Sequence, residues 1–251
     1  MIKFFRKIRQ SLLTENPTGD RAGKLTKYLA YAIGEILLVV IGILIALQVN
    51  NANETYKSSK ELDKVYQNLI QEFESNQFAL KVGQDQVKRT KKGSLELLSM
   101  MGRADEFQDK TDIDSLIEIS LFWPTWKPSN FVLNELRNSG KLSLLKNTKI
   151  INLLFEWERR IEFVNDWNAR MEKSSQEIVD FIKENGSLRN VNHTRISIPG
   201  SSFKTSNIVL FENIKFENQI DEKVVYTQFL QREYEKTNHL IDQILDESRK
   251  K

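Results

Sequence analysis

Residues 28–49 read YLAYAIGEILLVVIGILIALQV, and this stretch contains a single charged side chain, Glu35. A helix rises about 1.5 Å per residue, so these 22 residues span about 33 Å, close to the thickness of the hydrocarbon core of a bilayer. The stretch therefore predicts a transmembrane helix over residues 28–50. Its apolar core is about twice as long as that of a cleaved signal peptide, and no small-residue cleavage pattern follows it. We expect an uncleaved signal anchor.

Charge is distributed unevenly around this stretch. Residues 1–27 carry seven basic and two acidic side chains, which leaves 30 basic and 32 acidic residues for the remainder. Under the positive-inside rule, the N-terminus is expected in the cytoplasm and residues 51–251 in an extracytoplasmic domain. Nothing in the sequence predicts a basic face on that domain, so a nucleic-acid partner is not expected. The sequence contains no cysteine, which excludes disulfides, thiolate zinc sites and a cysteine nucleophile.

The basic tail, residues 1–27, begins with MIKFFRKIRQSLL. On a helical wheel the apolar side chains of this segment gather on one side and the cations on the other. This pattern is typical of a short amphipathic helix at a membrane surface. A flexible tail that only sets the orientation of the chain accounts for the same charges, and both interpretations stay open.

Glu35 lies inside the predicted transmembrane helix, where a carboxylate is costly and usually functional or paired. Helical periodicity places it on one stripe with Ala32, Val39, Gly42 and Ala46. Small residues four positions apart allow a second helix to approach closely, so the stripe predicts a contact between membrane helices. In the alternative interpretation, Glu35 bonds locally or reaches the interface, and the small residues have no role.

The segments KYLAYAIGEILLVVIGILIALQVNNANE (27–54) and MIKFFRKIRQSLLTEN (1–16) resemble a family of uncharacterised membrane proteins from Gram-negative bacteria. The segment NELRNSGKLSLLKN (134–147) is similar to its central region. Ala52 departs from the family pattern, in which Trp is frequent. The resemblance implies a single-span membrane protein of a bacterium. With the orientation expected from the charges, it would lie in the inner membrane with a periplasmic domain. It implies no activity, substrate or catalytic residue.

Residues 51–251 show mainly helical periodicity, which predicts an antiparallel bundle of long helices. Apolar side chains spaced by three and four form a heptad-like stripe over residues 62–87. The pattern further predicts helices over 95–98 (between Gly93 and Gly102), from Thr111 or Asp112 onward, over 131–138, over 148–185, and from about 217 to about 247. Residues 187–216 lose the period, and 196–198 and 207–211 are expected to form two short strands.

Two groups of aromatic residues are candidates for binding. The segment 121–131 contains Trp123 and Trp126, with Lys127 and Arg137 nearby. It is either a plug that seals one end of the bundle or a loop that binds a ligand or partner. Trp157 and Trp167 are expected to pack in and beside the core; the alternative is stacking of Arg159, Arg160 and Arg170 on their rings.

No catalytic, nucleotide-binding or metal-binding motif is present in the sequence, and no cofactor is expected. Asp109, Asp112 and Asp114 lack the spacing of a calcium loop, and the only two histidines, His193 and His239, are far apart. The sequence therefore favours a non-catalytic interaction or scaffold protein. The expected partners are the lipid bilayer and either a second copy or another membrane protein. The alternatives are a ligand-binding sensor module and, less favoured, an extracytoplasmic hydrolase.

Overall fold

A computed structural model describes residues 21–107 and 112–250. The described residues are mainly helical, without strands, as the periodicity predicted. The amphipathic helix expected near the start of the chain lies outside the described residues. The chain divides into two compact units, Met1–Lys60 and Glu61–Lys251. Helix α2 (Arg21–Met100) belongs to both units. It continues without a break after the apolar stretch, where the sequence contains no proline or glycine that would end a helix.

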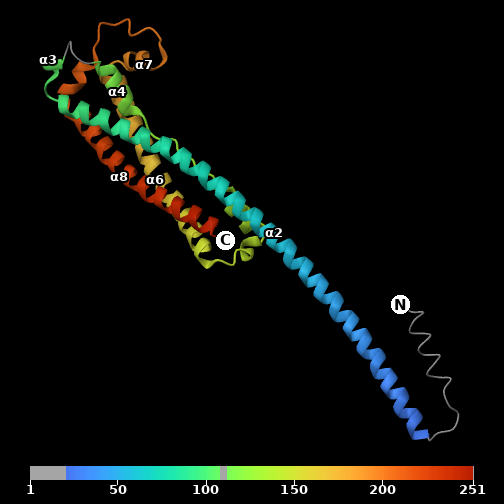
Figure 1. Cartoon of the computed structure of the whole chain (residues 1–251). Coiled ribbons are helices and arrows are strands. Elements are labelled where there is room, and N and C mark those ends of the chain that lie inside the picture. Colours follow the sequence, from blue (N-terminus) through green and yellow to red (C-terminus); the bar gives the residue numbers. More distant parts are fainter. Residues whose placement is uncertain (1–20, 108–111, 251) are drawn as a thin grey trace. The chain divides into compact units, whose positions relative to one another are not determined.

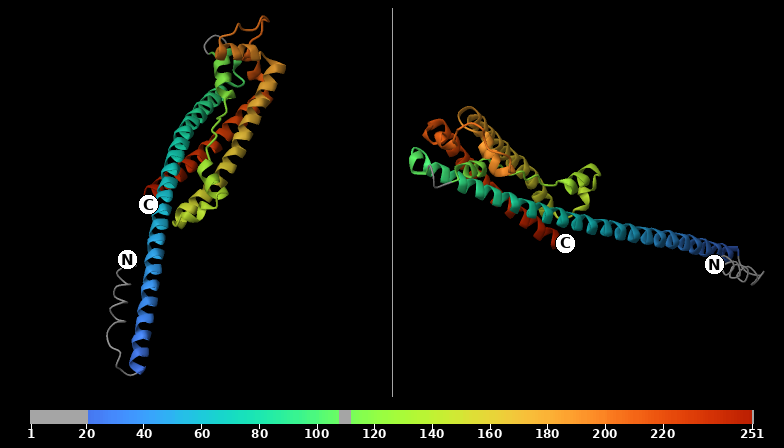
Figure 2. Two further views of the ribbon diagram at one scale, coloured as in Figure 1. Left: turned by 90° about the vertical axis from the view of Figure 1, so that its right-hand side faces the viewer. Right: turned by 90° about the horizontal axis from the view of Figure 1, so that it is seen from above.

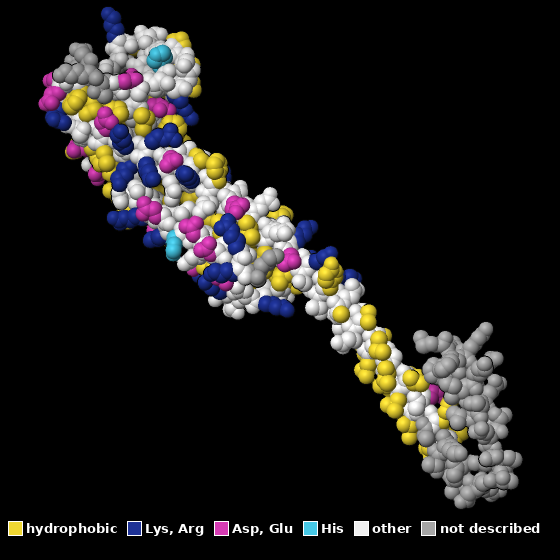
Figure 3. Space-filling view, in the orientation of Figure 1, with side chains coloured by type: hydrophobic (Ala, Val, Ile, Leu, Met, Phe, Trp, Pro, Cys, Tyr) yellow, Lys and Arg dark blue, Asp and Glu magenta, His cyan; other side chains and the backbone are white. Residues whose placement is uncertain are grey.

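In the first unit, residues 28–49 of helix α2 carry apolar side chains on all sides, and Glu35 is the single charged residue among them. Ile36, Leu44 and Val49 are more than half exposed, and Figure 3 shows hydrophobic side chains along this part of the helix. Within the part of the chain that the structure describes, α2 is the one helix long and apolar enough to cross a membrane. Its most apolar window has no buried residue.

The second unit is a helical bundle (Figures 1 and 2). Its long elements are the part of α2 after residue 60, α6 (Thr148–Asn185) and α8 (Ile214–Arg249). Helices α6 and α8 pack along each other and run in opposite directions. Helix α5 (Phe131–Asn138) and the 3-10 helix η1 (Lys141–Leu144) lie at one end, beside the start of α6. Helices α3 (Ala104–Phe107), α4 (Ile113–Leu121) and α7 (Leu188–Ile196) and the 3-10 helix η2 (Asn207–Glu212) lie at the other.

Local sequence signals fixed several helix boundaries correctly. Helix α6 has the predicted bounds; the side chain of Asn147 accepts the N–H of Lys149 at 2.9 Å and thereby caps its first turn. Asp112 caps α4 by accepting the N–H of Ser115 at 3.1 Å, while Thr111 lies outside the described residues. Helix α5 ends before Gly140, whose φ of 70° is a conformation that favours glycine.

The separate helix expected over residues 95–98 was wrong, because α2 continues through Gly93 to Met100. A methyl group at Gly93 would lie 2.7 Å from Cγ2 of Ile119 on α4. The glycine therefore allows α4 to approach α2 closely instead of interrupting the helix. Gly102, at a φ of 67°, is where the chain does turn.

The two strands expected within residues 187–216 were also wrong. The first falls at the end of α7 and beyond it, and the second lies in η2. The side chain of Asn207 accepts the N–H of Ser187 at 2.6 Å and donates to its carbonyl at 3.0 Å. A methyl group at Gly186 would lie 2.4 Å from the Asn207 Oδ1 atom, so this glycine both follows α6 and admits Asn207. Side-chain hydrogen bonds across the turn therefore replace strand pairing.

The hydrophobic core of the second unit consists of two separate clusters. The larger one, around Phe73, Trp157 and Tyr234, includes Val87, Met171 and Leu230 at its limit. The smaller one, around Phe181 and Phe216, begins at Leu97, Ile178 and Ile220. On each of the three long helices, about two to three turns separate the last residue of one cluster from the first of the other.

Candidate functional site

The stripe predicted on the apolar helix lies on α2 in the first unit. Glu35, Val39, Gly42 and Ala46 are exposed, and Ala32 is half-buried. Val39 is 58% exposed, and a methyl group at Gly42 would meet no atom within 4 Å. The stripe is thus a surface that a second helix can approach.

The residues predicted on the aromatic loop do not gather at one site. Trp126 is buried against Trp157 and Tyr234, with ring centroids 6.0 and 5.6 Å apart. Trp123 is 38% exposed and Lys127 is exposed. Arg137 forms an ion pair with Glu158 at 2.5 Å. A pocket combining both tryptophans with a free cation, on which the sensor alternative depended, is therefore not formed by these residues.

The aromatic loop, residues 122–130, is an extended segment held against α2. The side-chain amide of Asn76 donates to the carbonyl of Ser129 at 2.9 Å and accepts its N–H at 2.7 Å. One turn earlier on α2, the carboxylate of Glu72 accepts the N–H groups of Phe131 at 2.5 Å and Val132 at 3.0 Å. Glu72 thus caps the start of α5 from a different helix. The segment is part of the bundle wall.

A layer of buried polar side chains separates the two hydrophobic clusters. The three long helices and α4 supply these side chains, which are buried to at least 98%: Thr90, Ser94, Ser120, Ser174, Ser175, Lys223 and Thr227. Ser94 and Ser174 find no hydrogen-bond partner among the described residues. Buried polar groups stabilise a fold less than apolar ones, so this layer contributes less to the stability of the bundle than the two hydrophobic clusters do.

Lys223 is the charged residue of this layer, and its side chain is fully buried. Its ammonium donates to the carbonyl of Met171 at 3.1 Å and to the hydroxyl of Ser175. No carboxylate pairs with it in the part of the chain described by the structure. Loss of solvation on burial lowers the pKa of Lys223 to about 7.

Sequence reasoning did not identify Lys223. The available signal was its position three residues after Ile220 and four before Thr227, on the inward face of α8. The Ser175–Lys223 pair has the residue types of a nucleophile and a base, but both side chains are fully buried. In this conformation the pair has no access for a substrate.

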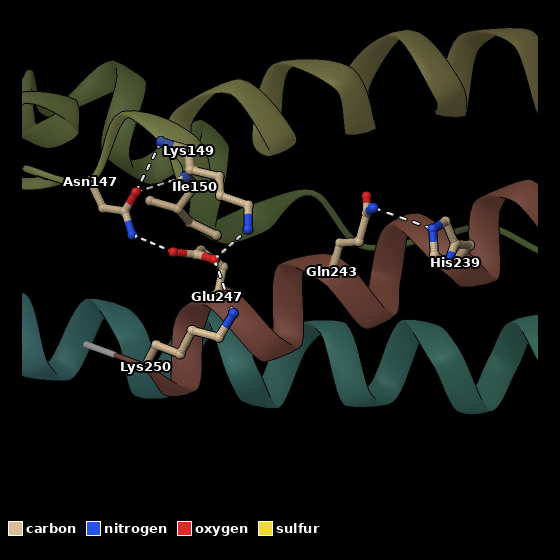
Figure 4. A network of polar contacts seen from close by, with 7 residues as sticks. All are labelled: Asn147, Lys149, Ile150, His239, Gln243, Glu247 and Lys250. Carbon is tan, nitrogen blue, oxygen red and sulfur yellow. Dashed lines mark hydrogen bonds and ion pairs between the residues drawn. The ribbon is translucent and has the colours of Figure 1, made fainter.

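A second polar network fastens the end of α8 to the start of α6 (Figure 4). The carboxylate of Glu247 accepts from the Asn147 side chain at 2.8 Å and forms ion pairs with Lys149 at 2.9 Å and Lys250 at 3.5 Å. The hydrogen bond from Asn147, followed by that from Lys149, lowers the pKa of Glu247 to about 2. Asn147 therefore both caps α6 and anchors α8.

A partly exposed aromatic surface lies where α6 and α8 meet. The ring of Trp167 stacks on Phe229 with centroids 4.9 Å apart and meets Tyr226 and Phe163 edge-on at 5.9 and 6.5 Å. We call these four residues the Trp167 surface. The guanidinium of Arg170 lies 5.5 Å from the centroid of the Trp167 ring, so the arginine contact that was the alternative to simple packing is present for this pair. Trp157, by contrast, is fully buried in the core.

Neither the surface hollows nor the acidic side chains of the described residues form a second candidate site. A hollow on the outer side of α6 is lined by Glu156, Glu158, Glu162 and Arg159, among others. Glu158 in this hollow is already paired with Arg137. Throughout residues 21–107 and 112–250, no group of three or more His, Cys, Asp or Glu side chains could hold a metal ion.

Neither the curated proteins nor the solved structures include a match to this chain. The match that was found covers most of the apolar stretch, the rest of α2 and the segment up to Trp123. Residues 35–123 match the model of a family of unknown function, DUF6090, as the resemblance to an uncharacterised family implied.

Proposed function

We propose that this chain is a membrane-anchored, non-catalytic interaction protein, held in a bilayer by α2 and associated through that helix with a second apolar helix. The observation that carries the proposal is the exposure of apolar side chains all around the helix. Ile36, Val39 and Leu44 point in different directions and are 63%, 58% and 58% exposed. A helix that is apolar on every side is stable only inside a large core or in lipid.

The contact surface of this helix is the stripe of Ala32, Glu35, Val39, Gly42 and Ala46. Gly42 and Ala46 keep the backbone accessible, so that a second helix packs closely there. Glu35 supplies a polar group whose best partner in hydrocarbon is another polar group on the neighbouring helix. The stripe thus combines close packing with a hydrogen bond.

The proposed location is the inner membrane of a bacterium, with the N-terminus in the cytoplasm and the helical domain in the periplasm. The basic residues before the apolar stretch support this orientation. Because the chain has no cysteine, a single Phe203→Cys substitution provides a unique label at a side chain that is 83% exposed. A membrane-impermeant maleimide should label Phe203→Cys in intact spheroplasts and Ser11→Cys only after permeabilisation. The reverse pattern would contradict the orientation.

Single cysteines also test the association. We expect Gly42→Cys to form disulfide-linked dimers in membranes and Leu44→Cys, on the opposite side of the helix, to form few. Adding Glu35→Leu to the Gly42→Cys chain should lower the dimer yield several-fold. Equal yields from Gly42→Cys and Leu44→Cys, or a yield that Glu35→Leu leaves unchanged, would contradict a contact through this stripe.

A further inference from the structure

We infer that the Trp167 surface of the helical domain is a docking surface for the same surface of a second copy of this chain. This inference rests on the proposed function, because anchoring in one membrane brings the two domains together. The surface consists of Phe163 and Trp167 on α6 and Tyr226 and Phe229 on α8. Phe163 and Phe229 remain 47% and 41% exposed although all four rings are in contact through Trp167.

Clusters of partly exposed aromatic side chains are the usual centres of protein interfaces. A ring that stacks on a neighbour is already fixed in one orientation, so little conformational entropy is lost when a partner covers it. Trp167 and Phe229 are nearly parallel, with an angle of 13° between their planes. They therefore form a rigid apolar centre on which another aromatic surface can pack.

The charges around the rings indicate which partner fits. Arg232 lies over Phe229, with the guanidinium 6.0 Å from the ring centroid, and is not part of an ion pair among the described residues. On the adjoining helix, Glu162 and Asp166 are exposed and likewise form no ion pair in the described part of α6 or its neighbours. An unpaired cation and unpaired acids therefore lie beside one apolar centre. The surface is self-complementary, because the cation of one copy can pair with the acids of the other.

Two contacts show that these charges lie at the same height along the bundle. Phe229 stacks on Trp167, and Glu233 forms an ion pair with Arg160 at 2.7 Å. Arg232 lies between Phe229 and Glu233 in sequence, so it is level with residues 160–167 of α6. That stretch contains Glu162 and Asp166.

A two-fold axis parallel to α6 and α8 preserves these heights in a dimer. It places α6 of one copy antiparallel to α8 of the other, as in a four-helix bundle. Arg232 of one copy then faces Glu162 and Asp166 of its partner, and the aromatic centres pack on each other. Both domains point in the same direction, which suits two chains anchored side by side in one bilayer. The anchors also raise the effective concentration of the domains.

Pairs of single-cysteine chains test this arrangement in the full-length protein in membranes. Chains with Asp166→Cys and differently tagged chains with Arg232→Cys should form mixed disulfide dimers. The matched control replaces Arg232→Cys with Val82→Cys, on α2, where the valine is 46% exposed and lies outside the Trp167 surface. We expect a yield at least several-fold above this control. A yield equal to the control would overturn the inference.

Two additional measurements keep the outcome clear. In full-length chains carrying Gly42→Cys, dimers that persist while the Asp166–Arg232 disulfide is absent would overturn the domain contact and leave the proposed helix association intact. Absence of both disulfides would contradict the proposed function as well. A charge reversal, Arg232→Glu, should reduce dimerisation of the domain, and adding Asp166→Arg should restore it. The inference is wrong if Arg232→Glu has no effect on dimerisation. It is also wrong if the double variant Arg232→Glu/Asp166→Arg has an unchanged circular dichroism spectrum and still does not form dimers.

Discussion

The ammonium of Lys223 on α8 donates a hydrogen bond to the backbone carbonyl of Met171 on α6 at 3.1 Å, in the interior of the helical bundle. The hydroxyl of Ser175 donates to the same carbonyl at 3.0 Å. Ser175 and the carbonyl of Met171 are therefore hydrogen-bonded to each other and do not need the lysine as a partner. Its burial is a cost to the fold that these hydrogen bonds only partly offset.

Replacing Lys223 with methionine should stabilise the helical domain at neutral pH. The two side chains have similar length, and Ser175 keeps its hydrogen bond to Met171 when the ammonium is removed. Exchanging a buried polar side chain for an apolar one of similar volume should raise the free energy of unfolding by about 1–2 kcal/mol. Urea unfolding of the full chain in detergent measures the change. Lys88→Met, at an exposed lysine of α2, should have little effect. Destabilisation by Lys223→Met would contradict this reasoning.

The same lysine should make stability depend on pH. Burial lowers the pKa of Lys223 from 10.5 to about 7, so between these values the unfolded chain binds more protons than the folded one. The lysine's contribution to stability is therefore least favourable below about pH 7 and improves as the pH rises towards 10.5. Unfolding midpoints measured from pH 7 to 10 should rise in the natural chain relative to Lys223→Met. Parallel curves for the two chains would show that the lysine does not titrate in this range.

Sequence periodicity was sufficient for the long helices but not for their contacts. The bounds of α6 follow from a continuous apolar stripe between a capping asparagine and Gly186, all of which are local signals. Gly93 was misread because a glycine inside a helical pattern is compatible with both a helix end and a close approach. Only the position of Ile119 on α4 distinguishes the two.

The polar features of the interior were hidden for a similar reason. The period of α8 places Lys223 inward, but the sequence does not reveal that Met171 and Ser175 face it from α6. The residues 207–211 have the composition of a strand, yet Ser206 caps the 3-10 helix η2 that contains them, and Asn213 caps the start of α8 directly after it. Contacts between distant segments thus decide what the local pattern leaves open.

Replacing Glu72 with alanine should destabilise α5 specifically. Its carboxylate accepts the N–H groups of Phe131 and Val132, and loss of a helix cap costs about 1–2 kcal/mol. Hydrogen exchange at the N–H groups of these two residues should accelerate in the full-length variant. Glu74→Ala is the matched control: it removes an exposed ion pair with Arg249 on α8, which is worth about 0–1 kcal/mol. Equal exchange rates in both variants would contradict the capping role.

Glu247 should protect the domain against acid. Hydrogen bonds from Asn147 and Lys149 lower its pKa from 4.5 to about 2, so the folded chain holds fewer protons than the unfolded one between these values. The stabilisation is complete above about pH 4.5 and is lost as the pH falls towards 2. Thermal unfolding between pH 6 and 2.5 should therefore depend less steeply on pH in Glu247→Gln than in the natural chain. An unchanged slope would indicate that other carboxylates account for acid unfolding.

The close approach at Gly93 predicts a coupling between two helices. In Gly93→Ala the new methyl group would lie 2.7 Å from Cγ2 of Ile119, so one side chain or helix must shift. Overpacking of this kind costs about 1–3 kcal/mol. Ile119→Ala removes the clashing atom, and the double variant should therefore be less destabilised than the sum of the two single variants. Denaturant unfolding of the four chains measures the coupling. Strict additivity would mean that α4 does not pack on Gly93 as the structure places it.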